Sequence, residues 1–199
     1  MEALKSLTAK ALVVHRDNID TDQIIPARFL KVTDKAGLGD ALFADWRYAE
    51  DGTPKSDFVL NQPWAKGRAI LVAGQNFGSG SSREHAPWAL LGYGFRAVIA
   101  RSFADIFRNN ALKNGVLPVA LGKTEHSKVL AALAADRDAE LTVDLEMCAL
   151  GLGGEHIANF EVDAFARHCL LNGLDQLGYL LHFEADIERY EAERSTRAY

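Results

Sequence analysis

The chain has 199 residues and a formal net charge of −5, with 48% hydrophobic and 25% charged residues. This composition is typical of a globular protein and argues against intrinsic disorder. The acidic balance, with no basic block along the chain, offers little to attract nucleic acid or an anionic membrane. Cys148 and Cys169 are the only cysteines, which excludes a disulfide framework or a self-contained iron–sulfur site and indicates a reducing compartment.

The termini and the length predict how the chain is organised. The N-terminus lacks the long apolar stretch of a signal peptide, and the longest apolar runs, such as 69–73, fall far short of the roughly 20 residues of a membrane helix. We therefore expect a soluble, cytoplasmic protein. The length predicts a single domain over 1–199, ending in a helical tail at about 163–199.

The first third of the chain predicts little more than one strand and one short helix. Residues 11–14 form a short apolar run that is typical of a strand. Residues 20–26 are expected to be an extended loop, because Pro26 lacks an amide donor and disfavours helix at Ile25. Glycine and proline break up residues 34–57, which predicts a short helix within a long excursion.

From residue 69 onward, predicted strands alternate with predicted helices. A glycine-rich loop follows the first of these strands and leads into the first helix. The alternation predicts an α/β domain with a largely parallel central sheet flanked by helices. The expected strands are 69–73, 97–100, 116–119, 141–145 and 157–162, and the expected helices are 83–91, 103–113, 123–135, 164–171 and 183–194.

The glycine-rich loop, GQNFGSGSSREH at 74–85, concentrates the chemistry of the sequence. It joins a predicted strand to a predicted helix, where free backbone amides bind anions. Arg83 stands where a dinucleotide-binding fingerprint requires its third glycine, and the loop has no lysine for a P-loop. A phosphate- or nucleotide-binding module nevertheless stays open as an alternative function of a different class.

Ser81 and Glu84 have the spacing of a helix capping box, which is the purely structural interpretation of the loop. That interpretation leaves the neighbouring Ser82 and Arg83 unexplained. A helix end would stabilise a Ser81 alkoxide by about 1–2 kcal/mol. A cation at ~4 Å would add roughly 4 kcal/mol at an effective dielectric of 20, so Ser81 would still be largely protonated. Further positive charge must therefore come from outside the loop.

Three separated motifs resemble the swivelling domain of the aconitase superfamily. They are DNIDTDQIIP at 17–26, GSGSSREHA at 78–86, and the stretch at 101–118 that begins RSFADIF. The first motif has the form found in the free-standing small subunits of bacterial isopropylmalate isomerases. The resemblance implies a single layered β/β/α domain, as in the aconitase C-terminal domain, with a partly parallel central sheet and flanking helices.

The resemblance also implies an activity and a partner. Family members interconvert 2-isopropylmalate and 3-isopropylmalate by dehydration and rehydration, in leucine biosynthesis. The family's large subunit carries a [4Fe-4S] cluster whose open iron acts as a Lewis acid and supplies the missing positive charge. We therefore expect this chain to bind no metal or cofactor and to be inactive alone. A small subunit of homoaconitase, or of another 2-alkylmalate hydro-lyase, stays open as an alternative.

The resemblance assigns roles to individual residues. Ser81 would be the base that removes the carbon-bound proton. Ser82 and Arg83 would hold a substrate carboxylate, for which the planar guanidinium of arginine is suited. Asp22 would hydrogen-bond a histidine of the large subunit, although a turn aspartate that caps its own loop is an equally simple interpretation.

The segment at 27–31 follows the first motif and, in the family, helps to recognise the variable group of the substrate. Arg28, Phe29 and Leu30 are therefore expected to bind substrate, with Phe29 and Leu30 facing its alkyl group. Packing against the core is the alternative for these two side chains.

Overall fold

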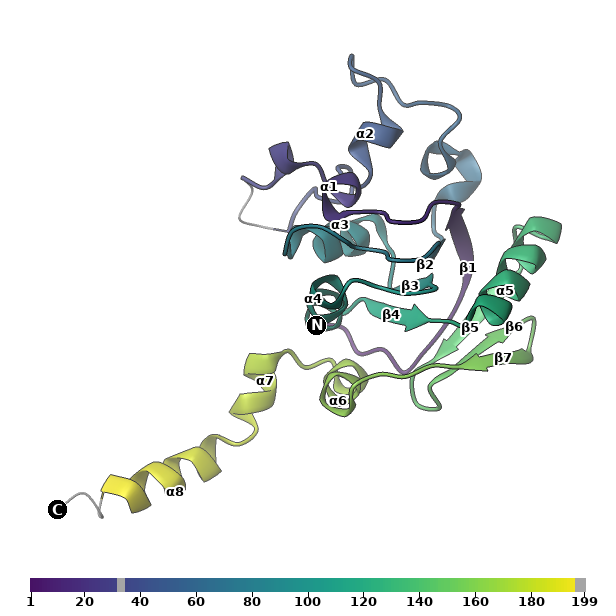
Figure 1. Ribbon diagram of the computed structural model, residues 1–199. Helices are drawn as coiled ribbons and strands as arrows, with labels where there is room; N and C mark the ends of the chain where they lie inside the picture. Colours follow the sequence, from purple (N-terminus) through teal and green to yellow (C-terminus); the bar gives the residue numbers. More distant parts are fainter. Residues whose placement is uncertain (32–34, 196–199) are drawn as a thin grey trace.

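A seven-stranded mixed sheet lies at the centre of the part of the chain that the structure describes (Figure 1). The computed structural model describes residues 1–31 and 35–195. The strand order is β4-β3-β2-β1-β5-β6-β7. The strands are β1 (Ser6–Val14), β2 (Ile70–Ala73), β3 (Ala97–Ala100), β4 (Leu117–Ala120), β5 (Glu140–Asp144), β6 (Ala149–Leu152) and β7 (Glu155–Asn159).

The sheet is parallel on one side of β1 and antiparallel on the other. β1 to β4 pair in parallel, with Val14 opposite Ala73 at the end of the β1–β2 ladder. β5 pairs antiparallel with β1, and β6 and β7 continue as an antiparallel meander. The predicted partly parallel sheet with flanking helices is confirmed, but the largely parallel form is wrong, because the strands after residue 139 turn back on one another.

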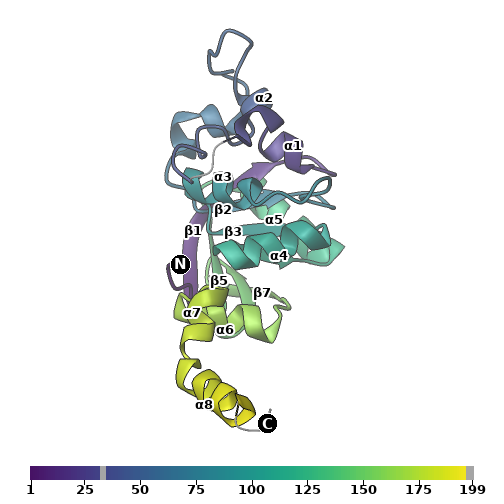
Figure 2. The ribbon, with the colours of Figure 1, turned by 90° about the vertical axis from the view of Figure 1, so that its left-hand side faces the viewer.

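Helices cover both faces of the sheet. Figure 2 shows α3 and α4 on one side, and α5 lies behind the sheet in that view. The helices are α1 (Thr21–Ile24), α2 (Ala44–Arg47), α3 (His85–Tyr93), α4 (Asp105–Asn114), α5 (Lys123–Ala135), α6 (Ala164–Asn172), α7 (Gln176–Leu181) and α8 (Glu184–Ser195). Three short 3-10 turns, η1 (Ala27–Phe29), η2 (Val59–Asn61) and η3 (Pro63–Ala65), interrupt the excursion between β1 and β2.

Two apolar clusters, one on each face, hold the sheet between the helices. Leu71 points into the cluster shared with α1 to α4, and its neighbours Ile70 and Val72 point into the cluster shared with α5 and α6. Successive strand residues face opposite sides of a sheet, so a strand covered on both faces must be apolar throughout. This requirement explains why β2 and β3 are uninterrupted apolar runs, each fully buried.

The segment at 20–26 is a helix at its start, so the predicted extended loop is wrong there. The Asp20 carboxylate accepts a hydrogen bond from the Gln23 amide at 2.8 Å, and the Gln23 side chain accepts from the Asp20 amide at 3.0 Å. This capping box satisfies backbone amides at the start of α1. Pro26 constrains only the residue before it, and Ile25 indeed has an extended backbone.

Two strands differ from the sequence prediction in their bounds: β1 begins at Ser6, five residues before the predicted strand at 11–14, and β7 ends at Asn159, three residues before the predicted end at 162. The segment at 123–135 is helical as expected, and the strands and helices between β2 and α5 shift by one or two residues. β6 and α7 were not predicted, since each is short and carries a glycine. The part of the predicted excursion at 32–34 lies outside the described residues.

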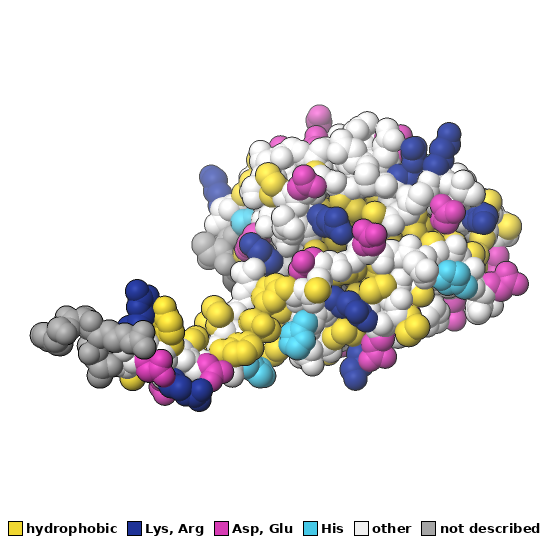
Figure 3. All heavy atoms as spheres, turned by 60° about the horizontal axis from the view of Figure 1, so that its bottom comes forward, with side chains coloured by type: hydrophobic (Ala, Val, Ile, Leu, Met, Phe, Trp, Pro, Cys, Tyr) yellow, Lys and Arg dark blue, Asp and Glu magenta, His cyan; other side chains and the backbone are white. Residues whose placement is uncertain are grey.

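The last helices form an arm. Figure 1 shows α7 and α8 leading away from the sheet, in the segment predicted as a helical tail. Apolar side chains gather along this arm and where it joins the rest of the chain (Figure 3). Leu177, Leu180 and Leu181 are each more than half exposed, whereas Tyr179 packs its ring against Phe165.

Candidate active site

The loops that follow β1 and β2 run side by side beyond the end of the sheet. The Gly74 amide donates to the Arg16 carbonyl at 3.0 Å, and the Gly78 amide donates to the Ile19 carbonyl at 2.7 Å. These bonds continue the parallel pairing of β1 with β2 into the two loops. The first and second sequence motifs are thereby brought together at the carboxyl edge of the parallel strands, where α/β proteins form their binding sites.

The third motif joins the same edge through Phe77. The Phe77 amide donates to the Ser102 carbonyl at 3.0 Å, and the Phe77 carbonyl accepts from the Ala104 amide at 3.0 Å. The Phe77 ring also packs edge-on against the rings of Phe103 and Phe107. The glycine-rich loop at 74–85, called the serine loop from here on, is thus anchored in an aromatic cluster. All three motifs therefore contribute to one site.

The first turn of α1 contacts the serine loop directly. The Thr21 amide donates to the Ser79 carbonyl at 2.8 Å, and the Thr21 hydroxyl donates to the Ser81 carbonyl at 3.1 Å. Thr21 is only 2% exposed. No role was predicted for Thr21 from the sequence, although the spacing of Asp20 and Gln23 is a capping-box signal that could have revealed the helix on which Thr21 lies.

Asp22 and Arg83 form a two-bond ion pair. It uses the two terminal nitrogens of the Arg83 guanidinium, which are called the Arg83 fork below. Arg83 Nη1 donates to Asp22 Oδ1, and Nη2 donates to Oδ2 at 3.1 Å. The Arg83 side chain is 16% exposed and that of Asp22 is 55% exposed, so the pair sits at the mouth of the site. The structure therefore brings these two predicted site residues together, with Asp22 filling the fork that is predicted to receive a substrate carboxylate.

Ser81 and Ser82 lie exposed between Gly80 and the start of α3. The capping box predicted from Ser81 and Glu84 is wrong, since α3 begins at His85 and its cap position, Glu84, makes no side-chain capping bond. The physical reason is that the positive φ of Gly80 (+94°) and the bond from α1 hold Ser81 outside the helix. Neither the Ser81 nor the Ser82 hydroxyl therefore caps α3.

The predicted alkyl-recognition residues lie in and next to the short turn η1. Arg28 forms an ion pair with Asp45 at 2.6 Å, and its guanidinium lies over the Phe29 ring at 4.8 Å. Phe29 and Leu30 are half-buried against the apolar cluster under α1 to α4. Arg28 and Phe29 also line an open hollow of about 490 Å³ beside α2. Within the described chain, no hydrogen bond or ion pair joins these three residues to the serine loop.

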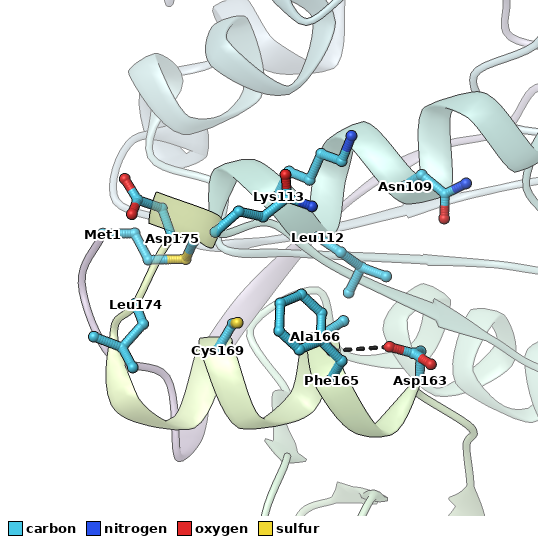
Figure 4. A pocket seen from close by; sticks show the side chains of 11 residues that line it. Met1, Asn109, Leu112, Lys113, Asp163, Phe165, Ala166, Cys169, Leu174 and Asp175 are labelled. Carbon is cyan, nitrogen blue, oxygen red and sulfur yellow. Dashed lines mark hydrogen bonds between the residues drawn. The ribbon is translucent and has the colours of Figure 1, made fainter. Parts of the chain in front are cut away.

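The described residues contain no group of three or more histidine, cysteine, aspartate or glutamate side chains placed to hold a metal ion. The two cysteines are free, and Cys169 lines a separate pocket between the N-terminus, α4 and α6 (Figure 4). Burial raises the pKa of the Cys169 thiol, with the nearby Asp175 carboxylate adding to the effect. None of the predicted site residues lines this pocket.

None of the described helices has the length and apolar character needed to cross a membrane.

The fold and the three converging motifs define an aconitase-type C-terminal domain. The family profile described as the aconitase C-terminal domain matches residues 1–124. The solved structure of a 3-isopropylmalate dehydratase from Methanocaldococcus jannaschii is similar, with a TM-score of 0.63 and 26% identity over 97% of this chain and 99% of that one.

Bacterial relatives show which family within this class the chain resembles. A 3-isopropylmalate dehydratase small subunit from Anaeromyxobacter dehalogenans is 58% identical over 194 residues, covering 98% of this chain and 100% of the relative. One from Chloroflexus aurantiacus is 55% identical over 192 residues, 96% of either chain. The chain belongs to the family of 3-isopropylmalate dehydratase small subunits, which confirms the resemblance inferred from the motifs. Membership makes it a hydro-lyase subunit and implies a large-subunit partner.

Gly78 combines a left-handed backbone with close packing against the aromatic cluster under the serine loop. Its φ is +77°, and an added Cβ would lie 2.1 Å from Cγ of Phe107. We expect Gly78→Ala to lower the free energy of unfolding by about 2–4 kcal/mol, combining backbone strain with overpacking. Gly67→Ala is the matched control, because Gly67 has φ of +82° and open space around it. Equal losses for the two variants in denaturant titrations would contradict this account of the loop.

Proposed function

We propose that the chain completes the active site of a 3-isopropylmalate dehydratase, which interconverts 2- and 3-isopropylmalate through dehydration and rehydration. The observation that carries the proposal is the convergence of the three motifs at the carboxyl edge of the parallel strands, with the exposed Ser81 two residues before Arg83 in the loop that α1 contacts. The relatives that match nearly the whole chain support the choice of reaction. The whole chain, residues 1–199, is proposed to act as one swivelling domain.

In this mechanism Ser81 is the base. Its oxygen takes the proton from one carbon of the substrate, the electrons of the broken C–H bond form a double bond, and the C–O bond to the neighbouring hydroxyl breaks. Rehydration reverses these steps with the hydroxyl and proton exchanged between the two carbons. Arg83 and Ser82 hold a substrate carboxylate, which fixes the carbon to be deprotonated within reach of Ser81.

The iron–sulfur cluster of this enzyme class does not fit this chain. A four-iron cluster requires about three or four thiolates. Cys148 and Cys169 are the only cysteines, and the raised pKa of Cys169 favours its neutral thiol. We therefore assign the [4Fe-4S] cluster to the large subunit, where it would supply the Lewis acid that assists departure of the hydroxyl.

Asp22 links partner docking to substrate binding in this proposal. In the isolated chain its carboxylate offsets the charge of Arg83 and fills its fork. A histidine of the large subunit that binds Asp22 would free Arg83 for the substrate carboxylate. Arg28, Phe29 and Leu30 are proposed to contact the alkyl group. The hollow beside α2, which Arg28 and Phe29 line, would give the segment at 27–31 room to adjust.

Replacing Ser81 by alanine tests its role as the base. We expect Ser81→Ala to lower kcat of the reconstituted enzyme by about 10²–10⁴-fold, the usual cost of losing a positioned proton-transfer group. Ser56→Ala, at another exposed serine, is the control and should keep full turnover. Turnover of Ser81→Ala within tenfold of wild type, measured in steady state, would refute the assignment.

Arg83→Lys separates charge from geometry. Lysine keeps the positive charge but cannot form two parallel hydrogen bonds to a carboxylate, so KM for isopropylmalate should rise as kcat falls. Arg189→Lys, at an exposed position of α8, should change neither constant. An unchanged KM for Arg83→Lys would show that Arg83 serves the loop and not the substrate.

The purified chain alone should be colourless, iron-free and inactive as an isomerase. Activity is expected only after anaerobic mixing with a cluster-bearing large subunit, and it should saturate at a fixed subunit ratio. The physical reason is that Asp22 offsets the charge of Arg83, so the loop supplies little of the positive charge that a Ser81 alkoxide needs. Isomerisation by the iron-free small chain would overturn the mechanism.

A further inference from the structure

Thr21 makes a side-chain contact that no role assigned so far explains. Its hydroxyl donates to the main-chain carbonyl of Ser81, and the side chain is almost completely buried. Its amide separately donates to Ser79, so that bond survives any change of side chain. The hydroxyl therefore adds one specific link, from the first turn of α1 to the peptide of the proposed base.

We propose that Thr21 is a positioning residue: its hydroxyl fixes the peptide of Ser81 and thereby aims the Ser81 side chain at the substrate carbon. The inference rests on the proposed role of Ser81 as the base. Thr21 touches neither substrate nor a reacting atom in this proposal, and it acts only through Ser81.

The position of this bond in the loop explains why it matters. The other described backbone bonds between the loops end at Ser79, and helical bonds resume where the Glu84 carbonyl accepts from the Trp88 amide. Between them Gly80 has φ of +94° and no side chain to restrict it. The Thr21 hydroxyl spans this gap and binds the main chain one residue after Gly80.

The bond is expected to affect the chemical step more than binding. Misplacing a reacting group by about 1 Å can cost roughly 10²-fold in rate. Thr21→Val removes the hydroxyl while keeping the branched shape, so kcat should fall by about 10–100-fold. KM should stay within about threefold, because Ser82 and Arg83 still hold the carboxylate.

The test uses the reconstituted two-subunit enzyme with Thr21→Val, Thr21→Ser and Thr8→Val. Thr21→Ser keeps the hydroxyl and should recover most of kcat. Thr8→Val is the matched control, since Thr8 is exposed on β1 and its hydroxyl pairs with that of Thr142. Circular dichroism and thermal melting establish how much of each variant is folded, and kcat is expressed per folded complex.

An isotope effect distinguishes positioning from a merely structural role. With substrate deuterated at the carbon that loses its proton, Thr21→Val should show a larger kinetic isotope effect than wild type, because proton transfer becomes slower relative to the other steps. A less stable but correctly arranged enzyme would keep the wild-type isotope effect. That result would overturn the proposal, as would a Thr21→Ser variant as slow as Thr21→Val.

Ser81→Ala, measured in parallel, separates this inference from the function on which it rests. Full turnover of Ser81→Ala would refute the proposed base and with it any reason to position the residue. An inactive Ser81→Ala together with a Thr21→Val variant of wild-type kcat would refute only the role of Thr21.

Discussion

The parallel pairing of β1 with β2 is the constraint on which the site depends. The register that sets Val14 opposite Ala73 determines which loop residues meet beyond the strands. Backbone bonds continue that register until Thr21 reaches Ser79, which places α1 against the serine loop. Because a shift of one residue would turn every strand side chain to the opposite face, the two apolar clusters also fix the geometry of the site.

The first turn of α1 has two opposite effects on the serine loop. Thr21 holds the Ser81 peptide in place, whereas Asp22 occupies the Arg83 fork that the substrate would need. In the proposed mechanism the same turn would position Ser81 and, in the isolated chain, keep the Arg83 guanidinium occupied by Asp22. A partner that draws Asp22 away would open the fork without disturbing the serine, so substrate binding would depend on assembly of the two subunits.

The sequence predicted the elements from β2 to α5 well, because each is a buried strand or a helix with clear ends, and the motifs identified the family. It could not predict that Asp22 and Arg83 pair, since residues 61 positions apart meet only through the sheet register. Thr21 was missed because its partner is the backbone carbonyl of Ser81, and a bond to a backbone group has no signature in the sequence. The Ser81 capping box failed because Gly80 turns the chain before α3 begins.

A structure of the assembled enzyme with bound substrate tests the account most directly, because it shows both effects of α1 at once. The account predicts that the Thr21 hydroxyl still donates to the Ser81 carbonyl, with the Ser81 oxygen facing the carbon to be deprotonated. It also predicts that Arg83 has exchanged Asp22 for a substrate carboxylate. A complex in which Asp22 still fills the Arg83 fork while substrate is bound elsewhere would contradict it.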